Sequence, residues 1–282
     1  MLRRVAAAAA RACGRVAHGA PPAAAATAPP WARGVSSAAN AAATGGASSP
    51  GLYEVRKYSV RPGLVPTYAS ACAATYPLRN ELLPGFLGMF VTETGGDPNE
   101  FVHFYHYSGL EERDAARARN GQHAEWKSFL GDTLHMLDAQ RSSVFVESAA
   151  CKTAAGAGAA SSFAPIGGDS PGAVYEMRTY QLRLGYDTVP EFYEYMQAGL
   201  PSKVAADSFS CGELVFMGHT DVGSLNEVVE LWRFPSMAAS LRAREAARGA
   251  REWRDAVGRV AGLAQSFTTQ LMRPVQGCSN WN

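Results

Sequence analysis

The stretch Tyr53-Glu-Val-Arg-Lys-Tyr-Ser-Val-Arg-Pro-Gly63 decides the fold of this chain, because it occurs a second time as Tyr175-Glu-Met-Arg-Thr-Tyr-Gln-Leu-Arg-Leu-Gly185. The two copies share six of their eleven positions and lie 122 residues apart. Repeats of solenoid proteins have periods of about 20 to 50 residues, so this longer period indicates a duplicated domain.

A second repeated block supports the duplication. Residues 99–107 match residues 226–234 at a shift of 127. An arginine and a Glu-Trp pair follow both blocks, in one half as Arg117, Glu125 and Trp126 and in the other as Arg244, Glu252 and Trp253. We therefore expect two halves that contain the same elements in the same order.

Each half is predicted to run strand, helix, strand, strand, helix, strand. The first strand alternates in hydrophobicity and stops at Pro62-Gly63, which is typical of a strand followed by a turn. The glycines and proline between residues 95 and 99 predict a turn between the second and third strands. The predicted strands are 52–60, 85–94, 101–107, 143–148, 174–183, 213–219, 227–234 and 266–272. The predicted helices are 65–80, 111–119 (interrupted at Asn120-Gly121 and continued by 122–137), 188–204 and 236–262.

This element order predicts an α+β fold made of two tandem ferredoxin-like β-α-β-β-α-β halves. Each half would form a four-stranded sheet with helices on one face, and the open face needs a cover. We expect the other half's sheet to supply it, which gives a pseudo-dimer of the dimeric-α+β-barrel type. The predicted segments are a presequence 1–36, linker 37–50, first domain 51–150, linker 151–172, second domain 173–275 and tail 276–282.

The N-terminal segment has the composition of a mitochondrial transit peptide. Residues 1–50 contain five arginines and no acidic residue, and the first carboxylate of the chain is Glu54. A secretory signal would need a longer and stronger apolar core than residues 6–10 provide. We expect a mitochondrial protein, most simply in the matrix, without a transmembrane segment. The alternative is an alanine-rich tail with no targeting role.

Charge and cysteine content exclude several classes of protein. Without the first 50 residues, 21 basic residues face 25 acidic ones, so nucleic acid is not an expected partner. The five cysteines contain no Cys-x-x-Cys pair, which argues against a disulfide framework and a zinc site. They are Cys13, Cys72, Cys151, Cys211 and Cys278.

Alternation along the strands predicts which side chains share a face. Glu54, Arg56 and Tyr58 fall on one face of the first strand, and Tyr53 and Val55 on the other. We assign the charged face to the interior between the two sheets. The candidate ligand-binding residues of that interior are Arg56, Tyr58, His103, Tyr105, Arg178, Tyr180, Glu230 and Trp232.

Two explanations of these buried charges stay open. A buried ion needs a partner, so Glu54 and Glu176 with Arg56 and Arg178 could form a structural network that ties the two sheets together. Alternatively, the arginines point into a ligand cavity and bind an anionic group, while the aromatic rings pack against its apolar body.

Catalytic and metal-binding motifs are missing from the sequence. His103 and His106 lie three apart on a predicted strand, so they face opposite sides and cannot bind one metal. No glycine-rich phosphate loop follows a predicted strand. His103 is more simply a hydrogen-bonded wall residue than a base or a haem ligand. The sequence predicts no catalytic residue, no metal site and no cofactor.

The repeated Tyr-Glu-x-Arg-x-Tyr, the aromatic-rich third strand and the later Arg and Glu-Trp positions resemble the NIPSNAP family over residues 52–275. The resemblance implies a dimeric-α+β-barrel-like fold, mitochondrial residence, and scaffolding or signalling roles, including mitophagy and vesicle transport. It carries over no catalytic residue. Two positions depart from the family pattern: Glu230 replaces a frequent histidine, and the C-terminus lacks the usual Ser-Pro-Leu ending.

Three hypotheses about function follow. The first is a mitochondrial adaptor or scaffold protein in quality control or transport, which binds other proteins such as autophagy adaptors and can form a homo-oligomer. The alternative is a small-molecule-binding α+β barrel or an oxygenase-like enzyme. A third, purely structural oligomer would be distinguished by light scattering.

Overall fold

The computed structural model describes residues 51–156, 172–209 and 212–279. The predicted presequence 1–36 and linker 37–50 lie outside the described residues, as does most of the linker 151–172.

The first half follows the predicted order, with shorter helices. Its predicted helix 65–80 is divided at Thr75, because Pro77 lacks the N–H that a continuous helix would use one turn back. Its elements are β1 (Leu52–Val60), a 3-10 turn (Pro62–Leu64), α1 (Val65–Ala74), α2 (Tyr76–Leu82), β2 (Phe86–Thr94), β3 (Glu100–Tyr107), α3 (Leu110–Asn120), α4 (Ala124–Leu134), β4 (Leu137–Glu147) and α5 (Ala149–Ala154).

The second half has the same order with a longer first helix. That helix continues through Pro201, and the predicted helix 236–262 is divided near Ala250. Its elements are β5 (Val174–Leu182), α6 (Thr188–Ala206), β6 (Glu213–Val222), β7 (Glu227–Phe234), α7 (Met237–Gly249), α8 (Arg251–Ala261) and β8 (Ala264–Ser279).

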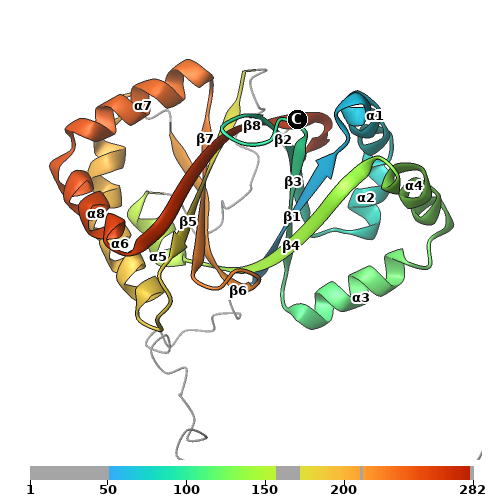
Figure 1. Ribbon diagram of the computed structural model, residues 1–282, viewed down its shortest axis with the longest axis horizontal. Coiled ribbons are helices and arrows are strands. Elements are labelled where there is room, and N and C mark those ends of the chain that lie inside the picture. The colour runs from blue at the N-terminus through green and yellow to red at the C-terminus, as the bar shows by residue number, and fades with distance from the viewer. Residues whose placement is uncertain (1–50, 157–171, 210–211, 280–282) are drawn as a thin grey trace, which may run out of the picture. The chain divides into compact units, whose positions relative to one another are not determined.

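The strands of the described chain close into one barrel in the order β1-β3-β2-β8-β5-β7-β6-β4. All neighbouring strands are antiparallel. Two seams join the halves: β2 pairs with β8, and β4 pairs with β6. Helices α1–α4 lie on one side of the barrel and α6–α8 on the opposite side (Figure 1). The α+β barrel is therefore closed within a single chain.

The barrel interior is an apolar core. It contains buried side chains from the strands of both halves, and the rings of Tyr53 and Phe216 lie 4.8 Å apart, while those of Phe90 and Tyr175 lie 4.7 Å apart. Two further cores lie between each half's strands and its own helices. Because Tyr53 faces the interior, its neighbours in sequence face the helices.

The predicted orientation of the candidate residues was therefore wrong. Arg56, Tyr58, His103, Tyr105, Arg178, Tyr180, Glu230 and Trp232 lie on the helix-covered faces, outside the barrel. Alternation determines which residues share a face, but not which layer that face meets. The helices supply the charged partners that make this face polar, among them Arg117 and Arg244.

Three predicted boundaries also move. Cys151, placed in the linker 151–172, belongs to α5 and is buried. Gln276, placed in the tail 276–282, belongs to β8, whose Ser279 pairs with Gly88 of β2. The predicted strand 143–148 begins earlier, at Leu137. No helix in the described ranges is long and apolar enough to cross a membrane.

Candidate functional site

The eight candidate residues form two groups, one beneath the helices of each half. Arg56, Tyr58, His103 and Tyr105 line a cavity of about 310 Å³ between β1 and β3 and helices α2 and α4, which we call the first-half pocket. Arg178 and Trp232 line a cavity of about 230 Å³ in the other half, the second-half pocket. Tyr180 and Glu230 are buried on the same face of that half.

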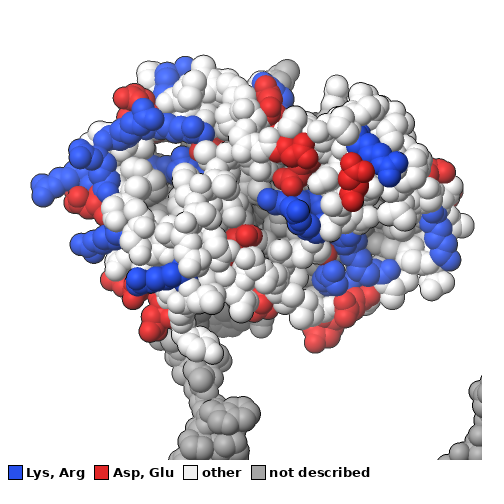
Figure 2. All heavy atoms as spheres, viewed as in Figure 1, with Lys and Arg blue, Asp and Glu red and all other residues white. Residues whose placement is uncertain are grey.

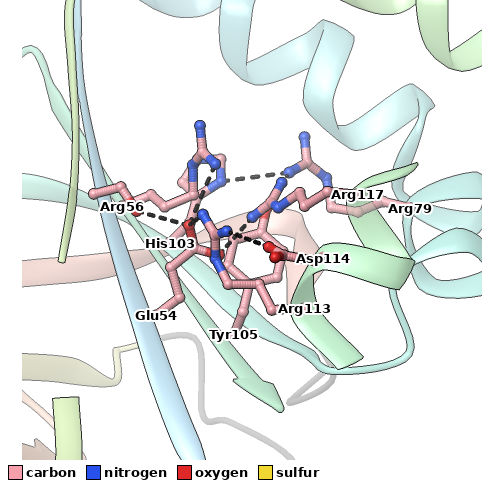
Figure 3. A network of polar contacts seen from close by, with 9 residues as sticks. Glu54, Arg56, Arg79, His103, Tyr105, Arg113, Asp114 and Arg117 are labelled. Atoms are coloured by element: carbon pink, nitrogen blue, oxygen red, sulfur yellow. Dashed lines mark hydrogen bonds and ion pairs between the residues drawn. The ribbon is translucent and has the colours of Figure 1, made fainter. Parts of the chain in front are cut away.

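A buried glutamate organises the arginines of the first half (Figure 3). The side chain of Glu54 is fully buried and accepts hydrogen bonds from Arg113 at 2.9 Å and Arg117 at 2.7 Å, both on α3. Ser142 donates to it at 2.6 Å and Arg56 at 3.4 Å. Burial by itself would raise the pKa of Glu54, but these donors lower it to about 2. The predicted Glu–Arg network exists, but it ties a strand to its own helix rather than one sheet to the other.

Arg79 is a buried cation without a carboxylate. It is 4% exposed and donates to the hydroxyl of Tyr105 at 2.9 Å. Its guanidinium lies 5.2 Å from the ring centres of Phe86 and Trp126. Among the described residues, no carboxylate forms an ion pair with it. Arginine does not discharge in proteins, so this pocket holds a permanent positive charge.

His103 lies beside Arg79 and is neutral. Burial lowers the pKa of His103 well below its usual range, and Arg79, Arg56 and Arg117 lower it further. Its Nδ1 is 3.4 Å from the Arg79 guanidinium, which can only donate, so Nδ1 accepts and the proton of the neutral ring resides on Nε2. In the described part of the chain, Nε2 has no acceptor.

The second half repeats the glutamate-centred network. Glu176 accepts from Arg178 at 2.7 Å and pairs with Arg244 of α7 at 3.0 Å, and the hydroxyl of Thr269 donates to it at 3.1 Å. Burial opposes its charge, but the two arginines lower the pKa of Glu176. Figure 2 shows a hollow in the surface beside α7 with basic side chains along it, where Figure 1 places the helix layer of this half.

Lys203 of α6 occupies the place that Arg79 has in the first half. Its Nζ lies 3.4 Å from the ring centre of Trp232 and 4.6 Å from that of Trp253. Glu230 is the nearest carboxylate, at 4.0 Å, and it accepts a hydrogen bond from the indole N–H of Trp232 at 2.7 Å. The register places Glu230 opposite Arg178, as it places His103 opposite Arg56.

Helices α6 and α8, which carry Lys203 and Trp253 of the second-half pocket, pack closely against each other. A Cβ at Gly199 of α6 would lie 2.5 Å from the Cβ of Ala256 on α8, so glycine is what lets these helices approach. The hydroxyl of Ser202 accepts from the backbone N–H of Trp253 at 2.9 Å and ties the same two helices together.

Sequence reasoning missed Arg79 and Lys203, the two cations that distinguish the pockets. A signal was present for Lys203, which lies eleven residues after the buried Phe192 on α6. Eleven residues are about three helical turns, so both side chains share a face of that helix. Arg79 lies eleven residues after Tyr68, but the break at Thr75 places these two on separate helices, so the same rule does not apply to it.

Several chemistries can be compared with this geometry. No group of three or more potential metal-ligating side chains occurs among the residues that the structure describes. The first-half pocket offers N–H donors and positive charge beside aromatic rings, which suits a flat anion. The second-half pocket offers an amine between two tryptophans.

Comparisons with known proteins agree with this architecture. The sequence model described as NIPSNAP matches residues 53–152 and 175–279, one region in each half. A search of curated proteins found no match.

Solved structures with the same fold span both halves. A protein from Lactobacillus acidophilus NCFM, described as a candidate monooxygenase, is 8% identical with a TM-score of 0.54 over 82% of this chain and 96% of its own. An anthrone oxidase-like protein is 13% identical with a TM-score of 0.50 over 80% of this chain and 94% of its own. These identities establish likeness of fold alone.

A protein from Agrobacterium tumefaciens, described as a NIPSNAP family protein with unknown function, is 27% identical over 33% of this chain and 85% of its own, with a TM-score of 0.32.

Proposed function

The chain belongs to the NIPSNAP family, and from that premise we propose that it binds a small organic anion in the pocket of its first half. A small-molecule-binding barrel is the alternative function that the sequence suggested. The proposed binding site lies between the sheet and the helices instead of in the barrel interior.

The observation that carries the proposal is a set of buried donors without acceptors. Nε of Arg56, Nε of Arg117 and Nε2 of His103 have no acceptor among the described residues, and all three side chains line the first-half pocket. An unmatched buried donor costs about 1–3 kcal/mol. A carboxylate or phosphate oxygen would satisfy these donors and balance the charge of Arg79.

The walls of the pocket define the rest of the ligand. Tyr58, Tyr105, Trp126 and Phe129 line the same cavity, so the body of the ligand is flat and apolar. A volume of about 310 Å³ lies at the lower end of the range for ligand pockets. The ligand class is therefore a small aromatic or conjugated acid.

Calorimetric titration with benzoate, salicylate and 1-naphthoate tests the proposal. We expect saturable binding of at least one acid, weakened tenfold or more by Arg56→Met, because that variant removes a donor while Arg113 and Arg117 still hold Glu54. Arg178→Met is the matched control, since it changes the same repeat position in the other half. Equal losses in both variants, or no binding of any acid, would contradict the proposal.

An adaptor role is the second candidate. Leu184, Tyr186 and Leu225 are exposed on two adjoining turns of the second half, which are joined by hydrogen bonds from the amide of Asn226 to the carbonyl groups of Arg183 and Gly185. Exposed apolar side chains that adjoin in this way are typical of protein contact sites.

Cross-linking and co-purification from mitochondria with intact or collapsed membrane potential test this role, including any quality-control or transport partner. We expect Leu184→Ser with Tyr186→Ser to lose partners that the parent chain retains. Light scattering would separate a partner complex from a homo-oligomer.

Mitochondrial residence is a further proposal, and it rests on the acid-free, arginine-rich residues 1–36. Deletion of this segment should leave the protein outside the organelle in a protease-protection assay. Import of the deleted form would contradict the proposal.

We also propose that the barrel arose from two ferredoxin-like halves, with the strand orders β4-β1-β3-β2 and β8-β5-β7-β6. These orders are segments of the closed barrel, and the repeated glutamate-centred networks support a common origin.

A further inference from the structure

The second-half pocket contains a buried primary amine that the proposed anion site does not use. Lys203 is 8% exposed and lines this pocket. Its Nζ has no hydrogen-bond acceptor among the described residues, and its nearest carboxylate, Glu230, is 4.0 Å away. An ammonium group in such a place buries a charge and lacks acceptors for its three N–H bonds, whereas a neutral amine has two N–H bonds and no charge to desolvate.

The surrounding charges are balanced without a proton on Lys203. Arg178 and Arg244 both pair with the buried Glu176, and the register places Arg178 opposite the buried Glu230, so two positive charges already accompany two negative ones. Burial lowers the pKa of Lys203 well below its usual range; Arg178 and Arg244 lower it further, and Glu230 and Glu176 oppose this shift. Asp207 and Arg248 also line the pocket.

Lys152 provides an internal contrast. It is also buried, at 1% exposure, but its Nζ forms an ion pair with Glu147 at 3.3 Å, and it lines neither pocket. The chain has four lysines, and the other two are Lys57 and Lys127. Lys203 is thus the lysine that combines burial, a cavity and an Nζ without an acceptor.

We propose that Lys203 is a nucleophilic amine that forms a Schiff base with an aromatic or conjugated aldehyde bound in the second-half pocket. The Nζ lone pair forms a bond to the carbonyl carbon, and the π electrons of the carbonyl move to its oxygen. One proton passes from the nitrogen to that oxygen and gives a hydroxyl group. As the C–O bond breaks, the nitrogen gives up its second proton, the hydroxyl takes up a proton and leaves as water, and the C=N bond forms. The exchange of an amine and an aldehyde for an imine and water needs no oxidant or reductant.

The walls of the pocket select this class of aldehyde. Trp232 and Trp253 flank the amine, and Phe267 lines the same cavity. A flat conjugated body fits between such rings better than a hydrated aliphatic one. Glu230 lies close enough to pass protons during loss of water, directly or through one water molecule. The inference is independent of the anion site, which lies in the other half.

Reductive trapping with benzaldehyde and sodium cyanoborohydride tests the proposal. The protein is the full chain with Lys57→Arg and Lys127→Arg, so that the two buried lysines are the only lysines left. At pH 6.5 we expect a benzyl adduct on Lys203, found by peptide mapping, at a rate at least tenfold above that of Lys152. Equal labelling of both lysines would mean that they react only in the unfolded chain. No label on Lys203 would mean that its ammonium group stays paired with Glu230. Either result would overturn the proposal.

The pH dependence of labelling in the parent chain gives a second readout. An ordinary lysine has a pKa of about 10.4, so its reactive fraction falls about tenfold for each pH unit below that value. Labelling of a reference peptide with one exposed lysine should therefore fall about a hundredfold from pH 8.5 to 6.5, and labelling of Lys203 by much less. Parallel profiles would overturn the proposal. The Lys203→Met variant should not form the adduct. If this variant does not fold, the labelling rates of Lys203 and Lys152 in the same protein still test the proposal.

Discussion

The two halves of this barrel use the same scaffold around different buried cations. In the first half, Arg79 lies beside neutral His103, and in the second, Lys203 lies beside Glu230. Arg79 lies 5.2 Å from the ring centre of Trp126 on α4, and Lys203 lies 4.6 Å from that of Trp253 on α8. The two halves thus differ in the residue that carries the extra positive charge, an arginine or a lysine, and in the side chain that lies beside it.

The choice between arginine and lysine can therefore determine which chemistry a duplicated pocket supports. Arginine stays charged at every physiological pH, so the first half keeps its surplus and attracts an anion. Lysine can release its proton when it is buried, so the second half can become neutral and expose a nucleophile. One duplication therefore gives two sites of different chemistry.

The largest effect should come from removing the carboxylate that only the second half has. Glu230→Gln removes a fully buried carboxylate that lies opposite Arg178 in the register and 4.0 Å from the amine of Lys203, and we expect it to lower the free energy of unfolding by about 4 kcal/mol in urea titration. His103→Gln changes the matching position of the first half, where no charge pair is lost, and should lower it by about 1 kcal/mol. Similar losses in both variants would remove the distinction between the halves.

Acid should affect both halves through the feature that they share. The pKa of Glu54 falls from an ordinary 4.5 to about 2 on folding, so its contribution to stability is complete above pH 4.5 and is lost as the pH falls towards 2. This contribution is about 3 kcal/mol. Glu54→Gln should flatten the dependence of unfolding free energy on pH in this window, and Glu176→Gln is the matched variant. An unchanged slope in Glu54→Gln would show that the carboxylate is not paired in solution.

Giving the first half the carboxylate of the second should convert its pocket. In His103→Glu, the new side chain lies opposite Arg56 and next to Arg79. We expect it to abolish binding of aromatic acids and to raise the free energy of unfolding by about 1 kcal/mol, because a charge-assisted hydrogen bond outweighs desolvation only slightly. Calorimetry and urea unfolding measure the two effects. Retained acid binding would place the anion elsewhere.

The smallest expected loss of stability comes from a variant whose affinity for aromatic acids should depend on pH. Arg79→Lys keeps the cation but allows it to discharge, and we expect a loss of stability below about 1 kcal/mol, since other contacts of the pocket stay in place. Affinity for aromatic acids should then fall as the pH rises from 7 to 9, whereas the parent chain should show a flat profile. A flat profile in both proteins would mean that Arg79 does not contact the anion.

Much of the fold followed from the sequence, because its signals are local. Alternating residues and turn-forming glycines predicted every strand of the barrel, and residues 227–234 match β7 at both ends. At Gly95, φ is 85° and a Cβ would lie 2.3 Å from the carbonyl oxygen of Thr269, which agrees with the predicted turn. The seams β2–β8 and β4–β6 could not be derived, because they depend on how two finished sheets meet.

The site was predicted in part. The sequence placed Arg56 with His103 and Arg178 with Glu230, and the strand register pairs these residues. The assignment to the interior failed because a charged face was assumed to be the wet one. Here the helices bring Arg117 and Arg244 to that face, so it is polar although it is covered.

The two seams also set the order in which the chain can become complete. During synthesis, β2 and β4 emerge well before β8 and β6, so a half-made protein exposes two bare strand edges that readily pair with other chains. The last strand consequently completes the barrel. A nascent chain that is released before Ala264–Ser279 has been synthesised has no strand to pair with β2. This architecture is therefore most vulnerable during biogenesis, before the barrel has closed.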